Sequence, residues 1–217
     1  KKRPSDVLVS WKKFLDKLEK EKGHRKATLI MHTEPTDNEG PNLFKVTEML
    51  NIQNNVFFST DRIGFEEMNI LYNISDFCIN MSYAEGFGLG TLEAMMTGTP
   101  IIAAKTGGLT RQVVDHRDRS ENGVALDIVT QTLVGSQSVP YIYEDYASTD
   151  DAAAAMYKIF TMSNYERSIL SEKVLKYARS EFNLQETVDM WHNTMLNTMK
   201  KFKKQLRKGK NFTLNEI

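Results

Sequence analysis

The residues best suited to chemistry lie in one glycine-rich stretch, Tyr83-Ala-Glu-Gly-Phe-Gly-Leu-Gly-Thr-Leu-Glu93-Ala-Met95. A short apolar run precedes the stretch, and a helical pattern begins in it at about Gly88. A turn of this kind lets backbone N–H groups approach an anion, and the helix N-terminus adds partial positive charge. The stretch therefore predicts a site for phosphate or diphosphate.

Two carboxylates flank this predicted site. Glu85 precedes the glycines, and Glu93 follows eight residues later inside the helical pattern. A phosphate group repels a neighbouring carboxylate, so the useful role for these acids is to accept hydrogen bonds from sugar hydroxyls. A diphosphate with one hydroxyl-rich ring at each end is a nucleotide sugar, and this is the ligand that the pair predicts.

Two other phosphate-binding patterns fit the sequence poorly. The dinucleotide fingerprint G-x-G-x-x-G, counted from Gly86, requires glycine where Thr91 stands, and Lys105 and Thr106 occupy the place of the acid expected about 20 residues on. The phosphate loop G-x-x-x-x-G-K-[ST] does not occur in the sequence. The sequence has neither an Asp-x-Asp motif nor a cluster of His or carboxylates with metal-ligand spacing, so we expect no metal site and no bound cofactor.

Short apolar runs alternate with amphipathic helical patterns through the first 126 residues. We expect helices over about 6–22, 43–50, 65–72 and 89–96, and strands over about 27–31, 56–58, 77–81 and 101–104. This alternation predicts an α/β fold with a Rossmann-like, doubly wound parallel sheet. Ligands of such sheets bind beyond the carboxyl ends of the strands, which is where the glycine-rich stretch falls.

The rest of the chain predicts mainly helices. Residues 127–149 look irregular, and the sequence assigns no role to 127–148. Helices are expected over about 151–162 and 164–180, and Ser163 and Glu166 have the spacing of a capping box at the start of the second. A last amphipathic helix should start near Gln185. We divide the chain into a nucleotide-sugar-binding domain, 1–182, and a C-terminal amphipathic helix with a basic tail, 183–217.

The composition limits the class of protein. The 217 residues include 28 basic and 28 acidic ones, and zero net charge argues against a general nucleic-acid binder. The single cysteine, Cys78, predicts no internal disulfide and a reducing compartment. Because no apolar run approaches the ~18 residues of a membrane helix, we expect a cytoplasmic protein.

Both ends of the chain raise further expectations. The first residue is Lys1 and not Met, so we expect a piece of a longer chain. The tail over 200–210 contains seven Lys or Arg residues in eleven positions. It could hold the protein peripherally to an anionic membrane surface or to a charged polymer, although a solvated helix end is the simpler interpretation.

The glycine-rich stretch is part of a wider pattern that continues with Gly98-Thr-Pro-Ile-Ile-Ala-Ala104 and Thr106-Gly-Gly108. Together these segments resemble the C-terminal domain of retaining glycosyltransferases with the GT-B fold. More narrowly, they resemble the glycosyl transferases group 1 family, which is family 4 of the glycosyltransferase classification. The similarity runs from about residue 2 to 126, with a weaker helical continuation to about 182, and the Glu-x7-Glu pattern is its most specific part.

The resemblance implies roles for the residues that match the family's motifs. Glu85 would contact the hydroxyls of the donor sugar and Glu93 those of the ribose, while Lys2 matches a basic residue before the first helix that offsets charge on the leaving group. The remaining matches hold the nucleotide: the diphosphate at Gly86, Phe87, Gly88, Leu89, Gly107 and Gly108, and the nucleobase at Asp61, Arg62 and Ile63.

The resemblance also implies a reaction. It is the transfer of a sugar from a UDP- or GDP-linked donor to an unknown glycan, lipid or protein acceptor, with retention at the anomeric carbon and without a metal. The acceptor would bind mainly to an N-terminal GT-B domain outside this chain, so the chain would be one part of the catalytic unit.

Some residues depart from the family pattern, and two other functions stay open. Thr110 and Arg111 stand where relatives often have Pro and Glu, and His32-Thr-Glu-Pro35 replaces a glycine-rich turn. The alternatives are a non-catalytic module that binds nucleotide sugars and a GT-B relative with other chemistry, such as a nucleotide-sugar epimerase.

Overall fold

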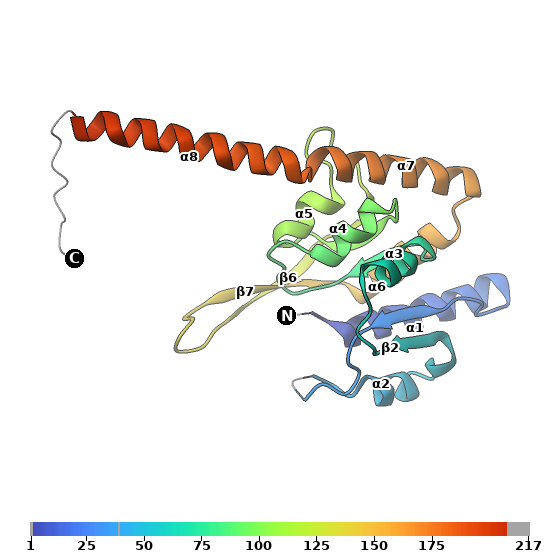
Figure 1. Ribbon diagram of the computed structural model, residues 1–217. Coiled ribbons are helices and arrows are strands. Elements are labelled where there is room, and N and C mark those ends of the chain that lie inside the picture. Colours follow the sequence, from blue (N-terminus) through green and yellow to red (C-terminus); the bar gives the residue numbers. More distant parts are fainter. Residues whose placement is uncertain (1, 39, 208–217) are drawn as a thin grey trace. The chain divides into compact units, whose positions relative to one another are not determined.

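The computed structural model describes residues 2–38 and 40–207, and the chain forms two compact units, Lys1–Ala178 and Arg179–Ile217 (Figure 1). The helices are α1 (Pro4–Lys22), α2 (Leu43–Met49), the 3₁₀ helix η1 (Gln53–Asn55), α3 (Phe65–Asn73), α4 (Leu89–Met96), α5 (Gly107–Val113), α6 (Thr149–Phe160), α7 (Asn164–Glu181) and α8 (Leu184–Arg207). The strands are β1 (Leu29–His32), β2 (Val56–Ser59), β3 (Cys78–Asn80), β4 (Ile101–Ala104), β5 (Gly123–Leu126), β6 (Ile128–Val134) and β7 (Ile142–Ala147).

Helix α1 shows how the apolar pattern produces the fold. Its apolar side chains recur at spacings of three and four residues and are buried on one face: Leu8, Trp11, Phe14, Leu15 and Leu18. Pro4 starts the helix, where a missing N–H costs no hydrogen bond. Gly23 ends it at φ 73°, a conformation that glycine adopts without strain. The helix expected over 6–22 is confirmed.

The strands that alternate with helices are parallel. In the described residues, β1 pairs with β2 in one sheet, and β3, β4 and β5 form a second sheet in that order. Strand β4 is buried along its whole length. Ile102 and Ala104 join the core that contains residues of α1 and α6, and alternation turns Ile101 and Ala103 to the other face, where α4 and α5 lie (Figure 1). The α/β class is confirmed, although the strands form two parallel sheets and not one.

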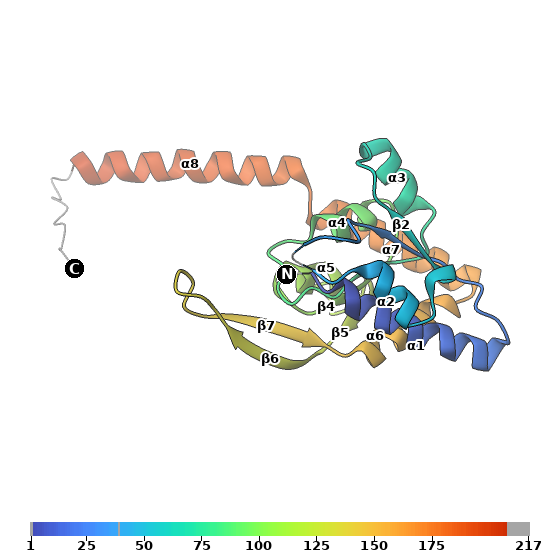
Figure 2. The same cartoon turned by 90° about the horizontal axis from the view of Figure 1, so that it is seen from below.

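Two segments differ from the expectation. Residues 107–113 form helix α5, which the sequence analysis did not predict. The interpretation of 127–149 as irregular was wrong, because β6 and β7 form an antiparallel hairpin with Leu133 opposite Tyr143 and Val134 opposite Ile142. Both views show this hairpin extending from the body of the first unit (Figures 1 and 2).

The base of the hairpin is tied to the loop after β3. The amide of Asp145 donates to the carbonyl of Tyr83 at 2.8 Å, and the rings of Tyr83 and Tyr146 lie 4.7 Å apart. The guanidinium of Arg3 lies 4.9 Å from the centre of each ring, and its Nη1 donates to the carbonyl of Ala147 at 3.2 Å. Arg3 therefore joins the start of α1, the loop after β3 and the end of β7.

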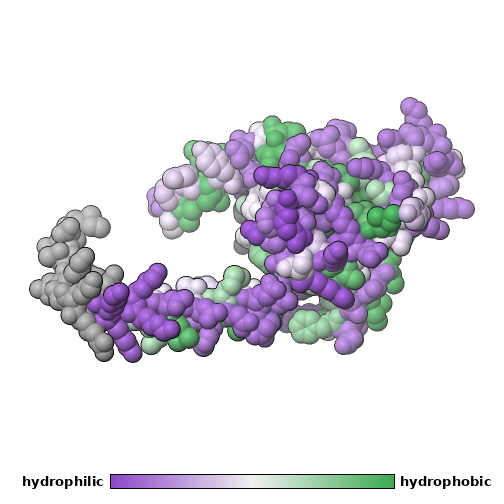
Figure 3. All heavy atoms as spheres, turned by 90° about the horizontal axis from the view of Figure 1, so that it is seen from above, coloured by the Kyte–Doolittle hydropathy of each residue, from purple (hydrophilic) through white to green (hydrophobic). Residues whose placement is uncertain are grey.

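The C-terminal helices follow the predicted pattern. At the start of α7, Ser163 and Glu166 form the expected capping box, in which the Ser163 amide donates to Glu166 Oε2 at 2.7 Å. Helix α8 carries an exposed apolar stripe, visible as green patches among hydrophilic residues (Figure 3). The stripe comprises Leu184, Val188, Trp191, Met195, Met199 and Phe202.

Of the predicted basic tail, residues 208–210 lie outside the described residues. No described helix combines the length and apolarity needed to cross a membrane.

Replacing Arg3 tests its role at the base of the hairpin. Arg3→Ala removes a largely buried guanidinium, a cation–π contact with two rings and the hydrogen bond to Ala147. We expect the free energy of unfolding to fall by about 2 kcal/mol, measured by urea denaturation. The control is Lys20→Ala, which removes an exposed cation from the same helix; equal effects of the two substitutions would contradict the role of Arg3.

Candidate functional site

The glycine turn, residues 85–88, connects the loop after β3 to helix α4. Gly88 is the N-cap of α4, and its φ of 89° lies in the left-handed region. Glycine adopts this backbone conformation without the steric strain that a Cβ atom would cause. No side chain caps this helix, so the amides of its first turn have no intrahelical acceptor. The predicted anion site is thus a helix N-terminus whose donors are backbone groups.

A second glycine-rich segment, Gly107-Gly108, packs directly against the glycine turn. The Gly108 amide donates to the carbonyl of Glu85 at 3.0 Å. A Cβ atom at Gly107 would lie 2.0 Å from the Glu85 carbonyl oxygen, and one at Gly108 would lie 2.6 Å from that of Gly86. Because only hydrogen fits there, both glycines are required for this contact between backbones. The resemblance places them at the diphosphate; their contacts in the structure give them a packing role.

The two candidate carboxylates belong to the glycine turn and to the helix that follows it. Glu85 is half-buried, and the Ser82 hydroxyl approaches its Oε2 at 3.4 Å. Glu93 is exposed on α4 and accepts a hydrogen bond of 2.9 Å from the hydroxyl of Tyr72 on α3. Burial and the neighbouring Glu93 raise the pKa of Tyr72 well above its ordinary value, so the phenol keeps its proton as a donor. An ionised carboxylate has several acceptor positions, and both acids can therefore accept further hydroxyl donors.

The sequence analysis missed a residue beneath the turn. Gln112 of α5 is fully buried, and its Nε2 donates to the carbonyl of Phe87 at 2.6 Å and of Gly88 at 3.2 Å. The hydroxyl of Thr91 donates to its Oε1 at 2.5 Å. A sequence signal existed, because Gln112 is a polar residue between Leu109 and Val113 on the apolar face of a helix.

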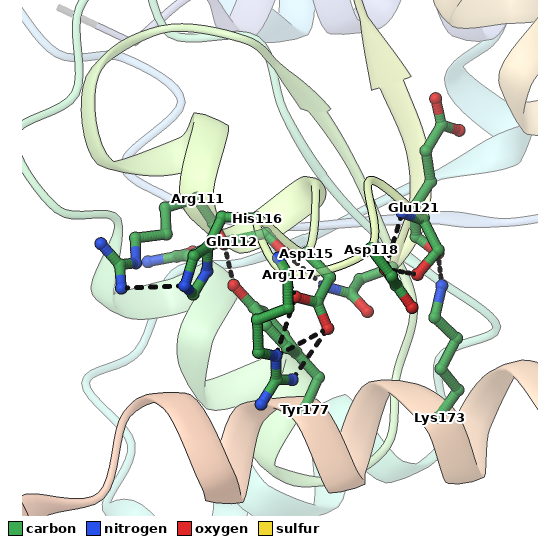
Figure 4. A network of polar contacts seen from close by, with 11 residues as sticks. Arg111, Gln112, Asp115, His116, Arg117, Asp118, Glu121, Lys173 and Tyr177 are labelled. Atoms are coloured by element: carbon green, nitrogen blue, oxygen red, sulfur yellow. Dashed lines mark hydrogen bonds and ion pairs between the residues drawn. The ribbon is translucent and has the colours of Figure 1, made fainter.

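Helix α5 is in turn held against α7 (Figure 4). The hydroxyl of Tyr177 donates to the carbonyl of Arg111 at 2.5 Å, and the guanidinium of Arg117 lies 4.8 Å from the centre of the Tyr177 ring. Arg117 also pairs with Asp115 at 2.8 Å, and its hydrogen bonds hold the pKa of that carboxyl below the usual range. The C-terminal end of α5 and the loop that follows it are therefore held against α7.

The other predicted site residues are not joined to this cluster. Asp61 and Arg62 are exposed in the loop between β2 and α3, with Ile63 half-buried, and Lys2 is exposed before α1. Within the described part of the chain, no hydrogen bond or ion pair links these four residues to Glu85 or Glu93. The described part of the chain also brings no three His, Cys, Asp or Glu side chains together as ligands for a metal ion.

Adding one methyl group tests the contact between the two glycine segments. Gly108→Ala would force a Cβ into the backbone of Gly86 and Phe87, so we expect the free energy of unfolding to fall by about 3 kcal/mol, the range of an overpacked site. The control is Gly86→Ala in the facing turn, where a Cβ would meet nothing within 4 Å. Urea denaturation of both variants measures the difference, and an equally stable Gly108→Ala protein would contradict the packing role.

Known sequences resemble this chain over part of its length. The D-inositol 3-phosphate glycosyltransferase of Corynebacterium diphtheriae is 40% identical over 83 residues, which are 38% of this chain and 18% of that protein. D-inositol 3-phosphate glycosyltransferase 2 of Catenulispora acidiphila is 30% identical over 112 residues, 49% of this chain and 26% of that protein. The chain thus spans about a quarter or less of the length of these curated relatives.

Solved structures share the fold. TarM of S. aureus, in a complex that includes UDP, matches 89% of this chain and 33% of its own, with a TM-score of 0.65 and 15% identity. The C-terminal domain of a glycosyl transferase group 1 family protein (LpcC) from Francisella tularensis matches 84% of this chain and 82% of its own, with a TM-score of 0.57 and 18% identity.

The family model described as glycosyl transferases group 1 matches residues 11–132, which include the glycine turn, both glutamates and the Gly107-Gly108 pair. The chain has the fold of the C-terminal domain of GT-B glycosyltransferases, and it belongs to the glycosyl transferases group 1 family.

Proposed function

We propose that residues 1–182 form the donor-binding domain of a retaining, metal-independent glycosyltransferase of family 4. The donor is a UDP- or GDP-linked sugar. The observation that carries the proposal is the uncapped N-terminus of α4, with Glu85 in the turn that precedes it and Glu93 in the helix that follows it. Backbone donors there suit a diphosphate, and each carboxylate suits the hydroxyls of one of the two rings that the diphosphate joins.

Transfer breaks the bond between the anomeric carbon and the diphosphate, and negative charge develops on the leaving group. In our proposal the first amides of α4, around Gly86, Phe87, Gly88 and Leu89, offset that charge where it develops. Lys2 adds a positive charge from the start of α1. Glu85 holds the donor sugar through its hydroxyls, Glu93 holds the ribose, and the loop at Asp61, Arg62 and Ile63 brackets the nucleobase.

The acceptor requires a second domain. We propose that an N-terminal GT-B domain binds a glycan, lipid or protein acceptor and closes over the donor held by this domain. Two solved structures with a similar fold support a nucleotide donor: the TarM complex includes UDP, and the complex of HepE from Anabaena contains UDP and glucose. The lysines near the end of α8 form a secondary proposal, a cytoplasmic enzyme that contacts an anionic membrane surface peripherally.

A ligand screen on the full chain tests the donor. We expect UDP or GDP, alone or with a sugar, to raise the melting temperature and to bind in calorimetry, because a ligand that binds only the folded state stabilises it. Uridine and guanosine serve as controls that lack the diphosphate, and they should bind much more weakly. The proposal fails if UDP, GDP, ADP and their sugars all leave the melting temperature unchanged in protein that contains both domains.

The two glutamates should be separable by substitution. In the enzyme with both domains, Glu85→Ala should reduce transfer by at least about 100-fold while leaving the affinity for free nucleoside diphosphate nearly intact. Glu93→Ala should weaken nucleoside diphosphate binding itself by about tenfold. Glu48→Ala, which removes an exposed carboxylate of α2, is the matched control. Identical effects of the Glu85 and Glu93 substitutions on binding and transfer would contradict the assigned roles.

A further inference from the structure

The side chain of Gln112 has a fixed orientation beneath the glycine turn. Its Nε2 faces the carbonyl oxygens of Phe87 and Gly88, which can only accept hydrogen bonds, and its Oε1 faces the hydroxyl of Thr91. Burying an amide is costly unless its hydrogen bonds are formed. The three partners supply them, so the primary amide is held in one orientation.

The contacts of Gln112 determine where the backbone amides of the turn point. All peptide bonds in the described residues are trans, and in a trans peptide the C=O and N–H groups point in opposite directions. With the Phe87 carbonyl held by Gln112, the Gly88 N–H points away from α5, and with the Gly88 carbonyl held, the Leu89 N–H does so too. Among the residues that the structure describes, neither of these N–H groups donates a hydrogen bond.

The backbone of Gln112 is also anchored. The Nδ2 atom of Asn122 donates to the main-chain carbonyl of Gln112 at 2.8 Å, and both residues are fully buried. Tyr177 of α7 holds the preceding carbonyl, that of Arg111 (Figure 4). The backbone from which the Gln112 side chain extends is therefore anchored, and the orientation of the turn is set from below.

We propose that Gln112 is a positioning residue that directs the amides of Gly88 and Leu89 at the diphosphate of the donor. This inference rests on the proposed function. It also explains why a polar side chain occupies an apolar position of α5: leucine at 112 could fill the volume, but it would remove the amide that donates to the Phe87 carbonyl and one of the donors to the Gly88 carbonyl, which also accepts from the Leu92 amide. Glutamate at 112 would face those carbonyls with an oxygen atom.

Two substitutions of Gln112 in the full chain test the inference. Gln112→Leu removes the donor, and Gln112→Glu keeps the shape but replaces the amide nitrogen with oxygen. We expect the affinity for UDP or GDP, whichever the unmodified protein binds, to fall by about tenfold in both, the loss of one hydrogen bond to a charged group. The affinity for the corresponding nucleoside should change little, because that ligand has no phosphate.

The pH dependence of Gln112→Glu adds a readout that a purely structural role would not move. Burial raises the pKa of a carboxyl group, and its protonated form can again donate to a carbonyl. We therefore expect the ratio of the variant's affinity to that of the unmodified protein to recover as pH falls from 8 to about 5.5. Taking the ratio cancels the titration of the phosphate itself.

Thr47→Val is the matched control, because Thr47 is also buried and donates to a carbonyl, that of Phe44, in helix α2. It should leave nucleotide affinity unchanged. Equal affinity of Gln112→Leu and unmodified protein for the diphosphate, or a Gln112→Glu ratio that stays constant with pH, would overturn the inference. If the unmodified protein itself binds neither UDP nor GDP, the proposed function fails and not the role of Gln112 alone.

Discussion

The structure of the site depends on one contact between backbones. The glycine turn after β3 and the first turn of α5 after β4 touch with no side chain between them, at Gly107 and Gly108. Strands β3 and β4 are hydrogen-bonded neighbours, so the segments that leave their carboxyl ends meet at the same edge of the sheet. A side chain at either glycine would separate them and would move Glu85 with the turn.

This arrangement gives a site made mainly of main-chain groups. Amides at a helix N-terminus cannot be rearranged by the rotation of a side chain, so their direction is set before the ligand arrives and little reorganisation is needed when charge develops. The supporting residues must then hold the backbone of the turn in this orientation. Gln112 satisfies two carbonyls that point inward, and α7 holds α5 through Tyr177 and Arg117. The neutral charge of the whole chain agrees with our proposal that local dipoles, and not a broad basic surface, bind the diphosphate.

The sequence predicted the parts of the fold that follow from local patterns. Helix α1 and strand β4 were found because their apolar residues have the spacing of a helix and the length of a buried strand. The hairpin was missed because Gly135 and Pro140 resemble loop residues, and because β6 is largely exposed and has no alternation of buried apolar residues. Gln112 was missed for a different reason, since its partners Phe87 and Gly88 lie 25 and 24 residues away.

The start of the chain shows how the contacts of one residue can place its neighbour. Lys2 is exposed, and its assignment rests on the resemblance alone. Its neighbour Arg3, however, lies against Tyr83 and Tyr146, and Tyr83 is two residues before Glu85. Lys2 is therefore joined to a residue that is held against the loop carrying Glu85. Because the same arginine fixes the base of the β6–β7 hairpin, the hairpin and the first turn of α1 are positioned together at the edge of the site.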